Sequence, residues 1–178
     1  MAVELPEGLK ERIAKVCGDL EATGAGLKVV GPENLHLTIK FLGDITEEQL
    51  GKAKSVMAGL AGSGAFKLKL EGLGYFGTPG FIRIVWIGSS EGSQKLISLM
   101  LFAKLKLADV RKDDFQENKV HLTIARANSA KNREKLLEFL EKNSGLEIGE
   151  MEVKEVRLME SKLTPQGPIY KEVYKVSL

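Results

Sequence analysis

The two histidines of this chain occur in the same four-residue context. His36 begins His36-Leu37-Thr38-Ile39, His121 begins His121-Leu122-Thr123-Ile124, and the sequence contains no third histidine. Imidazole is the side chain best suited to exchange protons near neutral pH. Two imidazoles in one context could work as a pair in which one accepts a proton and the other donates one. We therefore expect His36 and His121 to be the catalytic residues.

Apolar and polar residues alternate through both copies, which is typical of a strand with one buried face. We expect these strands at 35–41 and 120–125. The histidine and the threonine of each copy then share the polar face, because they are two positions apart. A threonine hydroxyl can donate a hydrogen bond to a phosphate oxygen. We expect Thr38 and Thr123 to bind the substrate in this way.

The pair suits an in-line displacement at phosphorus, in which the entering and leaving oxygens lie on opposite sides. Each proton transfer could contribute roughly 10²- to 10⁴-fold in rate, and positioning and charge stabilisation must supply the rest. Two nearby cations have alternative interpretations. Lys40 shares the face of His36 and either holds phosphate or is solvated. Arg126 falls on the opposite face by strict alternation, so it reaches the site only if the strand ends or twists there; the alternative is a surface ion pair.

The surrounding sequence predicts the elements that position this pair. Leu9, Ile13, Val16, Cys17 and Leu20 form an apolar stripe at helical spacing. Thr46-Glu47-Glu48-Gln49 has the pattern of a capping box at the start of a second helix. Ser129 is a suitable cap for the last helix. We expect helices at 6–23, from 46, at 92–107 and at 130–142, further strands at 65–71, 81–87, 151–160 and 169–177, and a loop at 109–119.

An offset of 85 positions relates His36 to His121 and also relates most of these elements to one another. Outside the tetrapeptides the letters differ, so the repeat is one of architecture. We expect a single bilobal domain over 1–178, with an internal repeat at about 1–88 and 89–178 and an approximate twofold axis. The element order favours an α+β fold with antiparallel sheets and outer helices. Each lobe would contribute one histidine strand to a central cleft.

Composition narrows the classes of partner and location. The net charge of +2 is low for a protein that coats a nucleic-acid duplex, but a few local cations can still build an anion site. No apolar run approaches the roughly 20 residues of a membrane span, and the first residues lack the pattern of a signal peptide. The one cysteine, Cys17, excludes an internal disulfide and fits a reducing compartment. We expect a cytoplasmic monomer without a membrane partner.

Other motifs predict less. The segment 72–77 matches the dinucleotide-binding pattern of glycines, but it leads into another strand instead of a helix, so the site for a pyrophosphate is missing. Two histidines and one distant cysteine do not form a zinc site, and we expect neither metal nor cofactor. Tyr75, Phe76, Trp86 and Tyr170 could stack on bases, although core packing is the better interpretation for Trp86.

The motifs resemble those of the 2H phosphoesterase superfamily, and most closely the RNA 2′,3′-cyclic phosphodiesterase family, also called 2′-5′ RNA ligase-like or LigT-type. The first motif, 35–43, reads Leu-His-Leu-Thr-Ile-Lys-Phe-Leu-Gly, the second, 121–126, reads His-Leu-Thr-Ile-Ala-Arg, and the segment 161–170 is similar to the C-terminal part of that family. The resemblance covers nearly the whole chain. One departure is the opening strand of the family, of which only the end is present, at Ala2-Val3-Glu4.

The resemblance implies an enzyme that opens a 2′,3′-cyclic phosphate at an RNA 3′ end and leaves a 2′-phosphate. His36 would donate the proton to the departing 3′ oxygen and His121 would activate water, with Thr38, Thr123 and Arg126 on the phosphate. The near-symmetric repeat does not itself distinguish the two histidine roles.

Two alternatives stay open. The same site could join tRNA half-molecules through a 2′-5′ bond without ATP; the chain has no Lys-x-Asp-Gly adenylation motif. The second alternative is a non-catalytic protein that binds RNA ends. The intact histidine and threonine of both motifs argue against it.

Overall fold

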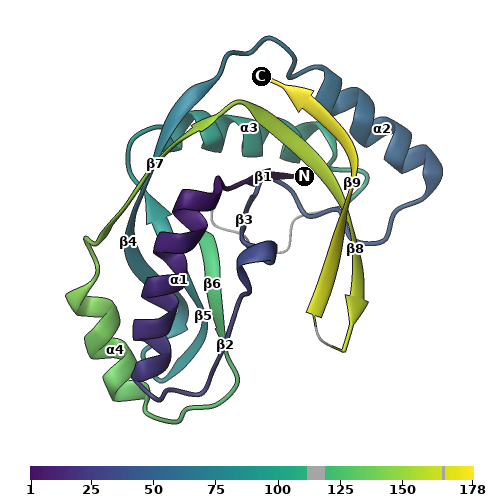
Figure 1. Cartoon of the computed structure of the whole chain (residues 1–178). Coiled ribbons are helices and arrows are strands. Elements are labelled where there is room, and N and C mark those ends of the chain that lie inside the picture. The colour runs from purple at the N-terminus through teal and green to yellow at the C-terminus, as the bar shows by residue number, and fades with distance from the viewer. Residues whose placement is uncertain (112–118, 166) are drawn as a thin grey trace.

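The computed structural model describes residues 1–111, 119–165 and 167–178. In those ranges the chain forms two antiparallel sheets and a set of α-helices around them (Figure 1). The elements are β1 Ala2–Glu4, α1 Glu7–Ala22, β2 Leu27–Val29, the 3₁₀ turn η1 Pro32–Asn34, β3 His36–Thr38, α2 Glu47–Ala58, β4 Phe66–Thr78, β5 Phe81–Ser89, α3 Ser93–Lys106, β6 Leu122–Ala127, α4 Arg133–Lys142, β7 Glu147–Val153, β8 Glu155–Thr164 and β9 Gly167–Ser177.

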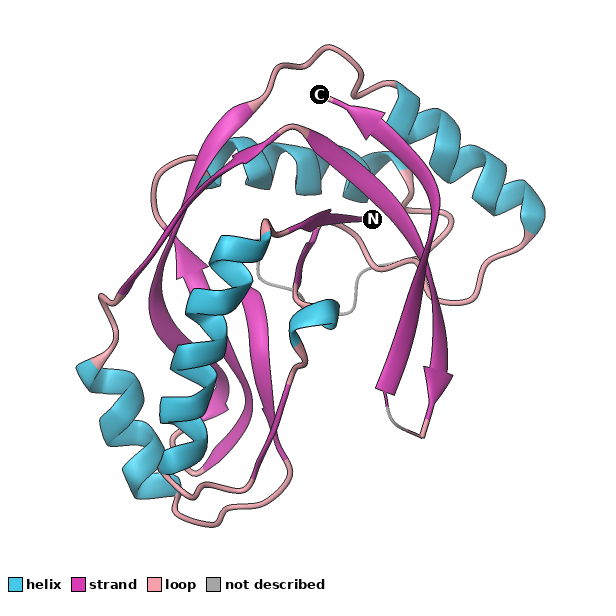
Figure 2. Cartoon of the chain, in the orientation of Figure 1, coloured by secondary structure: helices cyan, strands magenta, loops and turns pink. Residues whose placement is uncertain are grey.

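The smaller sheet has the strand order β3-β1-β8-β9, and the larger has the order β2-β6-β5-β4-β7. Every pairing between neighbouring strands is antiparallel. The helices lie outside the sheets, and Figure 2 shows α1 and α4 on one face of the larger sheet. This arrangement confirms the α+β class that the element order predicts.

The two sheets do not coincide with the two halves of the sequence. The first histidine strand, β3, lies in one sheet with the β8–β9 hairpin, which comes from the second half. The second histidine strand, β6, pairs with β5 of the β4–β5 hairpin, which comes from the first half. Each histidine strand is therefore supported by a hairpin of the opposite half. Alternation locates strands in a sequence, but it does not say which strands pair.

The apolar stripe of α1 explains which face of the larger sheet is covered. The residues of this stripe, Leu9, Ile13, Val16, Cys17 and Leu20, are all buried, as predicted. On β6 the apolar residues Leu122 and Ile124 are also fully buried in the same core. Covering this face leaves the opposite face of β6 for the polar side chains of the second motif, because successive residues of a strand point to opposite sides.

Of the two helix caps predicted from the sequence, the one at α2 is confirmed and the one at α4 is wrong. At α2 the backbone N–H of Gln49 donates to Thr46 Oγ1 at 3.3 Å and the backbone N–H of Thr46 donates to Gln49 Oε1 at 2.9 Å, so the capping box is confirmed. The predicted Ser129 cap of α4 is wrong. The helix begins at Arg133, after Asn132 with a φ of 49°, and Ser129 Oγ instead accepts a weak hydrogen bond of 3.4 Å from the backbone of Lys131.

Several strands differ from the predicted ones in length or number. The expected strand at 151–160 is two strands, β7 and β8, which separate at Lys154. The three-residue strand β2 carries too short a pattern to be predicted. The short β1 is present and pairs with both β3 and β8. The expected loop at 109–119 lies largely outside the described residues.

The glycine-rich segment 72–77 lies within β4, which extends beyond the expected end of this strand at 71. The segment leads to β5 and not to a helix, as predicted. Among the helices that the structure describes, none is long and apolar enough to cross a membrane.

Candidate active site

The two histidine strands approach each other where the two sheets meet. Strands β3 and β6 have Cα atoms within 8 Å of one another. His36 and Thr38 are half-buried on one side of β3, and Leu37 between them is buried. The same pattern of exposure holds for His121, Leu122 and Thr123. The predicted alternation is therefore confirmed over 35–39 and 120–124. It is wrong beyond these residues, because β3 ends at Thr38, Lys40 is buried and Phe41 is exposed, and Ala125 is buried next to Ile124.

Each imidazole is held through Nδ1 by a backbone carbonyl two residues earlier. The separation is 2.8 Å from His36 Nδ1 to Asn34 O and 2.9 Å from His121 Nδ1 to Lys119 O. A carbonyl oxygen only accepts hydrogen bonds, so Nδ1 carries the proton in both rings. Nε2 is then the atom of each ring that exchanges a proton with a substrate. The two carbonyls are again 85 positions apart.

An aromatic ring also holds each histidine. Phe76 on β4 contacts His121 in an edge-to-face arrangement, with centroids 4.8 Å apart and planes at 87°. Tyr170 on β9 contacts His36 in the same way, at 5.2 Å and 72°. Each aromatic residue comes from the half of the sequence opposite to its histidine. The sequence marks both rings as candidates for base stacking, but their contacts with the histidines depend on strand pairings that local patterns do not reveal.

Burial lowers the pKa of both histidines below the ordinary value of 6.5. In each ring the hydrogen bond from Nδ1 opposes this effect. The positive charges of Lys119 and Arg126 lower the pKa of His121 further. For His36 the charges differ, because the N-terminal amine lowers its pKa and the carboxylate of Glu4 raises it. Glu4 lies opposite His36 in the pairing of β1 with β3.

A pocket of about 120 Å³ opens beside the first motif. His36 and Thr38 line it together with Ser161 and Tyr170 of the β8–β9 hairpin. Ser161 and Tyr170, the ends of the segment that the sequence relates to the family only by resemblance, therefore form a wall of this pocket. Tyr170 both lines the pocket and contacts the ring of His36.

A bulge in β6 decides where Arg126 points. Val85 pairs with Ala125 and Trp86 pairs with Thr123, so Ile124 is an extra residue in β6. Ile124 and Ala125 are both fully buried, and Arg126 is exposed. The extra residue reverses the alternation beyond it. The bulge therefore meets the condition under which Arg126 reaches the site: Arg126 lies on the side of His121, whose pKa its charge lowers.

Lys40 is only 3% exposed, although it lines the pocket of His36. Its Nζ donates a hydrogen bond of 3.0 Å to the carbonyl of Arg111. The alternative of a solvated lysine is therefore wrong, and a role in holding phosphate stays a prediction. Trp86 is buried, as expected, and Lys119 Nζ lies 4.1 Å from the centroid of its ring. Within the described ranges, no three or more His, Cys, Asp or Glu residues form a group suited to a metal ion.

Comparison with known proteins gives the class. The family model "LigT like Phosphoesterase" matches the chain twice, at residues 3–86 and 87–170. The offset between these matches is 84 positions, close to the offset between the two motifs. The chain belongs to the LigT-like family of 2H phosphoesterases.

Similar proteins cover nearly the whole chain. A Methanothermobacter thermautotrophicus protein named RNA 2′,3′-cyclic phosphodiesterase is 35% identical over 97% of this chain and 94% of its own length. An Archaeoglobus fulgidus protein of the same name is 37% identical, over 97% and 96%. Among solved structures, a Thermus thermophilus protein superposes with a TM-score of 0.80 at 26% identity, over 99% of this chain and 95% of that one. Escherichia coli LigT in its apo form gives 0.74 at 25% identity, over 99% and 94%.

Proposed function

We propose that this protein hydrolyses the 2′,3′-cyclic phosphate at RNA 3′ ends to a 2′-phosphomonoester. The observation that carries the proposal is the matched pair of imidazoles, each fixed at Nδ1 by a carbonyl at 2.8 or 2.9 Å and each with a threonine two residues later on the same side. The names of the full-length relatives, RNA 2′,3′-cyclic phosphodiesterase, support the substrate class.

In this reaction the Nε2 atom of His121 accepts a proton from water as the water oxygen bonds to phosphorus. The bond from phosphorus to the 3′ oxygen breaks, and Nε2 of His36 donates a proton to that oxygen. The product keeps its phosphate on the 2′ oxygen, and the two histidines have exchanged protonation states. Thr38, Thr123 and Arg126 donate hydrogen bonds to the non-bridging oxygens, whose charge develops during the displacement.

The unequal surroundings of the two rings support this assignment of roles. A general base must be neutral before the reaction, and the cations Lys119 and Arg126 favour the neutral form of His121. A general acid must carry its proton, and Glu4 favours the charged form of His36. The N-terminal amine near His36 has a pKa lowered to about 5 by burial, so it is mostly neutral at pH 7. Burial still lowers the pKa of His36, and Glu4, which pairs with Arg157 at 2.6 Å, is a nearby charge that opposes this effect.

We further infer that the protein acts on RNA fragments in the cytoplasm as a monomer. The support for a reducing compartment is the use of cysteine: the chain has one, Cys17, and therefore no internal disulfide.

Product analysis tests the proposal. The purified protein is incubated in EDTA with an RNA that ends in a 2′,3′-cyclic phosphate, with and without a second RNA that carries a 5′-hydroxyl. The expected product is a 2′-phosphomonoester in both incubations, identified by phosphorus NMR. A joined RNA as the main product would show that the reaction is ligation and not hydrolysis. A 3′-phosphate would show that the 2′ oxygen leaves and would reverse the assignment of the leaving oxygen. Binding of the RNA without turnover would show that the protein is a non-catalytic RNA-end binder.

A further inference from the structure

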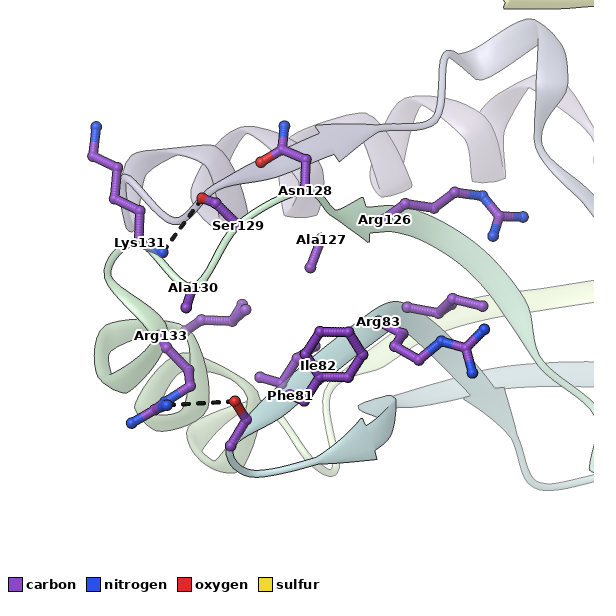
Figure 3. Close-up of a pocket in the computed structure, with 13 residues that line it drawn as sticks. Phe81, Ile82, Arg83, Arg126, Ala127, Asn128, Ser129, Ala130, Lys131 and Arg133 are labelled. Carbon is purple, nitrogen blue, oxygen red and sulfur yellow. Dashed lines mark hydrogen bonds between the residues drawn. The ribbon is translucent and has the colours of Figure 1, made fainter.

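A second pocket, of about 400 Å³, opens between the ends of β5 and β6 (Figure 3). The two strands pair as far as Ile84 and Arg126 and then separate. Apolar side chains from β5, β6 and α4 line the space between them, namely Ile82, Ala127 and Leu136. This pocket is larger than the one beside His36, and Arg126 is the one residue of its lining that the proposed reaction uses.

Four cationic side chains line this pocket, and no carboxylate does: Arg83, Arg126, Lys131 and Arg133. None of the four forms an ion pair with any residue that the structure describes. Figure 3 shows Arg83 and Arg126 extending in the same direction at one end of the pocket, with Lys131 and Arg133 at the other end. Like charges that surround a hollow focus a positive potential into it, which attracts an anion.

Arg133 adds a second observation that points to a ligand. Its Nη1 donates a long hydrogen bond of 3.4 Å to Gly80 O, whereas its Nε is buried and has no partner among the described residues. A buried donor without an acceptor costs free energy, and such donors are rare in native proteins. Because Nε has almost no exposed surface, an anionic oxygen in the pocket would become its acceptor only after the Arg133 side chain shifts.

Arg126 connects this pocket to the active site. It lines the pocket, and its charge also lowers the pKa of His121. A second bulge acts on Arg83: Phe76 pairs with Ile84 and Gly77 pairs with Ile82, so Arg83 is an extra residue in β5. Arg83 is exposed, and Figure 3 shows it extending to the same side as Arg126. The cations therefore continue from the histidine site along the end of the sheet.

We propose that this pocket binds a backbone phosphate of the RNA strand on the 5′ side of the reacting cyclic phosphate. The inference rests on the proposed function and extends it, because it requires a substrate longer than one nucleotide. The chemistry fits a nucleotide unit: cations for the phosphate, an apolar floor for a sugar or base, and the ring of Phe81 at the rim. Phe81 is 70% exposed, so one face is available for stacking on a base.

The double variant Arg83→Gln/Lys131→Gln tests the pocket with two substrates, adenosine 2′,3′-cyclic phosphate and a longer oligoribonucleotide with the same cyclic end. For the oligonucleotide we expect KM to rise roughly tenfold. We also expect the slope of the logarithm of the binding constant against the logarithm of salt concentration to fall by about one for each lost phosphate contact. For the single nucleoside we expect kcat and KM to stay at wild-type values, because it has no second phosphate to contact Arg83 or Lys131. The matched control is Lys15→Gln/Lys142→Gln, which removes two exposed charges elsewhere.

The two substrates separate a failure of this inference from a failure of the proposed function. No turnover of either substrate by the wild type would overturn the proposed function. Turnover of both, with KM for the oligonucleotide equal in the double variant and the wild type, would overturn the phosphate pocket. An equal loss on both substrates would also overturn it, because the two residues would then act on the reacting end. Thermal unfolding of each variant confirms that it is folded.

Discussion

Phe76 contacts His121 across the two halves of the sequence, with its ring edge-to-face on the imidazole and the centroids 4.8 Å apart. Phe76 lies on β4 of the first half and His121 precedes β6 of the second. The contact helps to bury the imidazole, and burial is the main cause of its lowered pKa. The aromatic ring is therefore a positioning group for the histidine that we propose as the general base.

Replacing Phe76 tests this positioning role. In Phe76→Ala we expect the pKa of His121 to rise towards 6.5, because water reaches the ring, and kcat to fall roughly tenfold as the imidazole becomes mobile. Proton NMR measures the pKa directly, since the chain has only two histidine signals to assign. Phe76→Tyr keeps the ring and should retain both values. A fall in kcat with no change in the pKa of His121 would contradict the role.

The pH dependence of the reaction follows from the lowered pKa values. Activity requires protonated His36 and neutral His121, and both pKa values lie below 6.5 in the free protein. The rate therefore falls as pH rises above the pKa of His36, and it falls again as pH drops below the pKa of His121. We expect a bell-shaped profile of kcat/KM with its maximum below pH 6.5. Because the two histidines act together, the two apparent pKa values of this profile belong to the pair and not to either residue alone.

The profile of kcat should differ from that of kcat/KM. A bound phosphate anion favours both imidazolium forms, so the maximum of kcat should move to higher pH. Rates measured across pH at constant ionic strength give both profiles. A maximum of kcat/KM above pH 6.5 would be inconsistent with buried, depressed histidines.

Arg126 should act on both substrate and base. In Arg126→Gln we expect kcat/KM to fall by roughly 10- to 100-fold, the usual size for a lost hydrogen bond from a charged group, and the pKa of His121 to rise because a nearby positive charge is removed. Arg126→Lys keeps the charge but loses the paired donors, so only the pKa should be retained. Lys28, which lies opposite Arg126 in the pairing of β2 with β6, gives the control Lys28→Gln. If this control raised the pKa of His121 as much as Arg126→Gln does, the claim that Arg126 specifically lowers this pKa would be contradicted.

The exchange of strands between halves predicts that neither half folds alone. Residues 1–88 lack the β8–β9 hairpin that supports β3, and residues 89–178 lack the β4–β5 hairpin that supports β6. Each fragment would expose the apolar faces that the whole chain buries. We expect the isolated fragments to show no cooperative thermal transition, and the full chain to show one. Cooperative unfolding of either fragment would show that it is an independent domain.

The sequence predicts the placement of the two histidines and the two threonines well because the signal is local. Alternation over His36 and Thr38, and again over His121 and Thr123, places each pair on one polar face, and the structure agrees. The capping box at Thr46 is equally local and is confirmed. In each case the residues that make the signal also make the contact, so no knowledge of the rest of the fold is needed.

Features that depend on distant partners could not be predicted. Strict alternation puts Arg126 on the wrong face because a single extra residue, Ile124, shifts the alternation, and a bulge leaves no periodic signal of its own. The contacts of Phe76 and Tyr170 with the histidines depend on which hairpin supports which strand. The free energy of these pairings comes from the whole core.

The most direct test of the central claim is the turnover of His36→Ala and His121→Ala on a nucleoside 2′,3′-cyclic phosphate in EDTA. If the two imidazoles are the acid and the base, each variant should lose roughly 10²- to 10⁴-fold in kcat, while thermal unfolding shows that both remain folded. If either variant keeps kcat within about tenfold of the wild type, the paired-histidine mechanism is wrong.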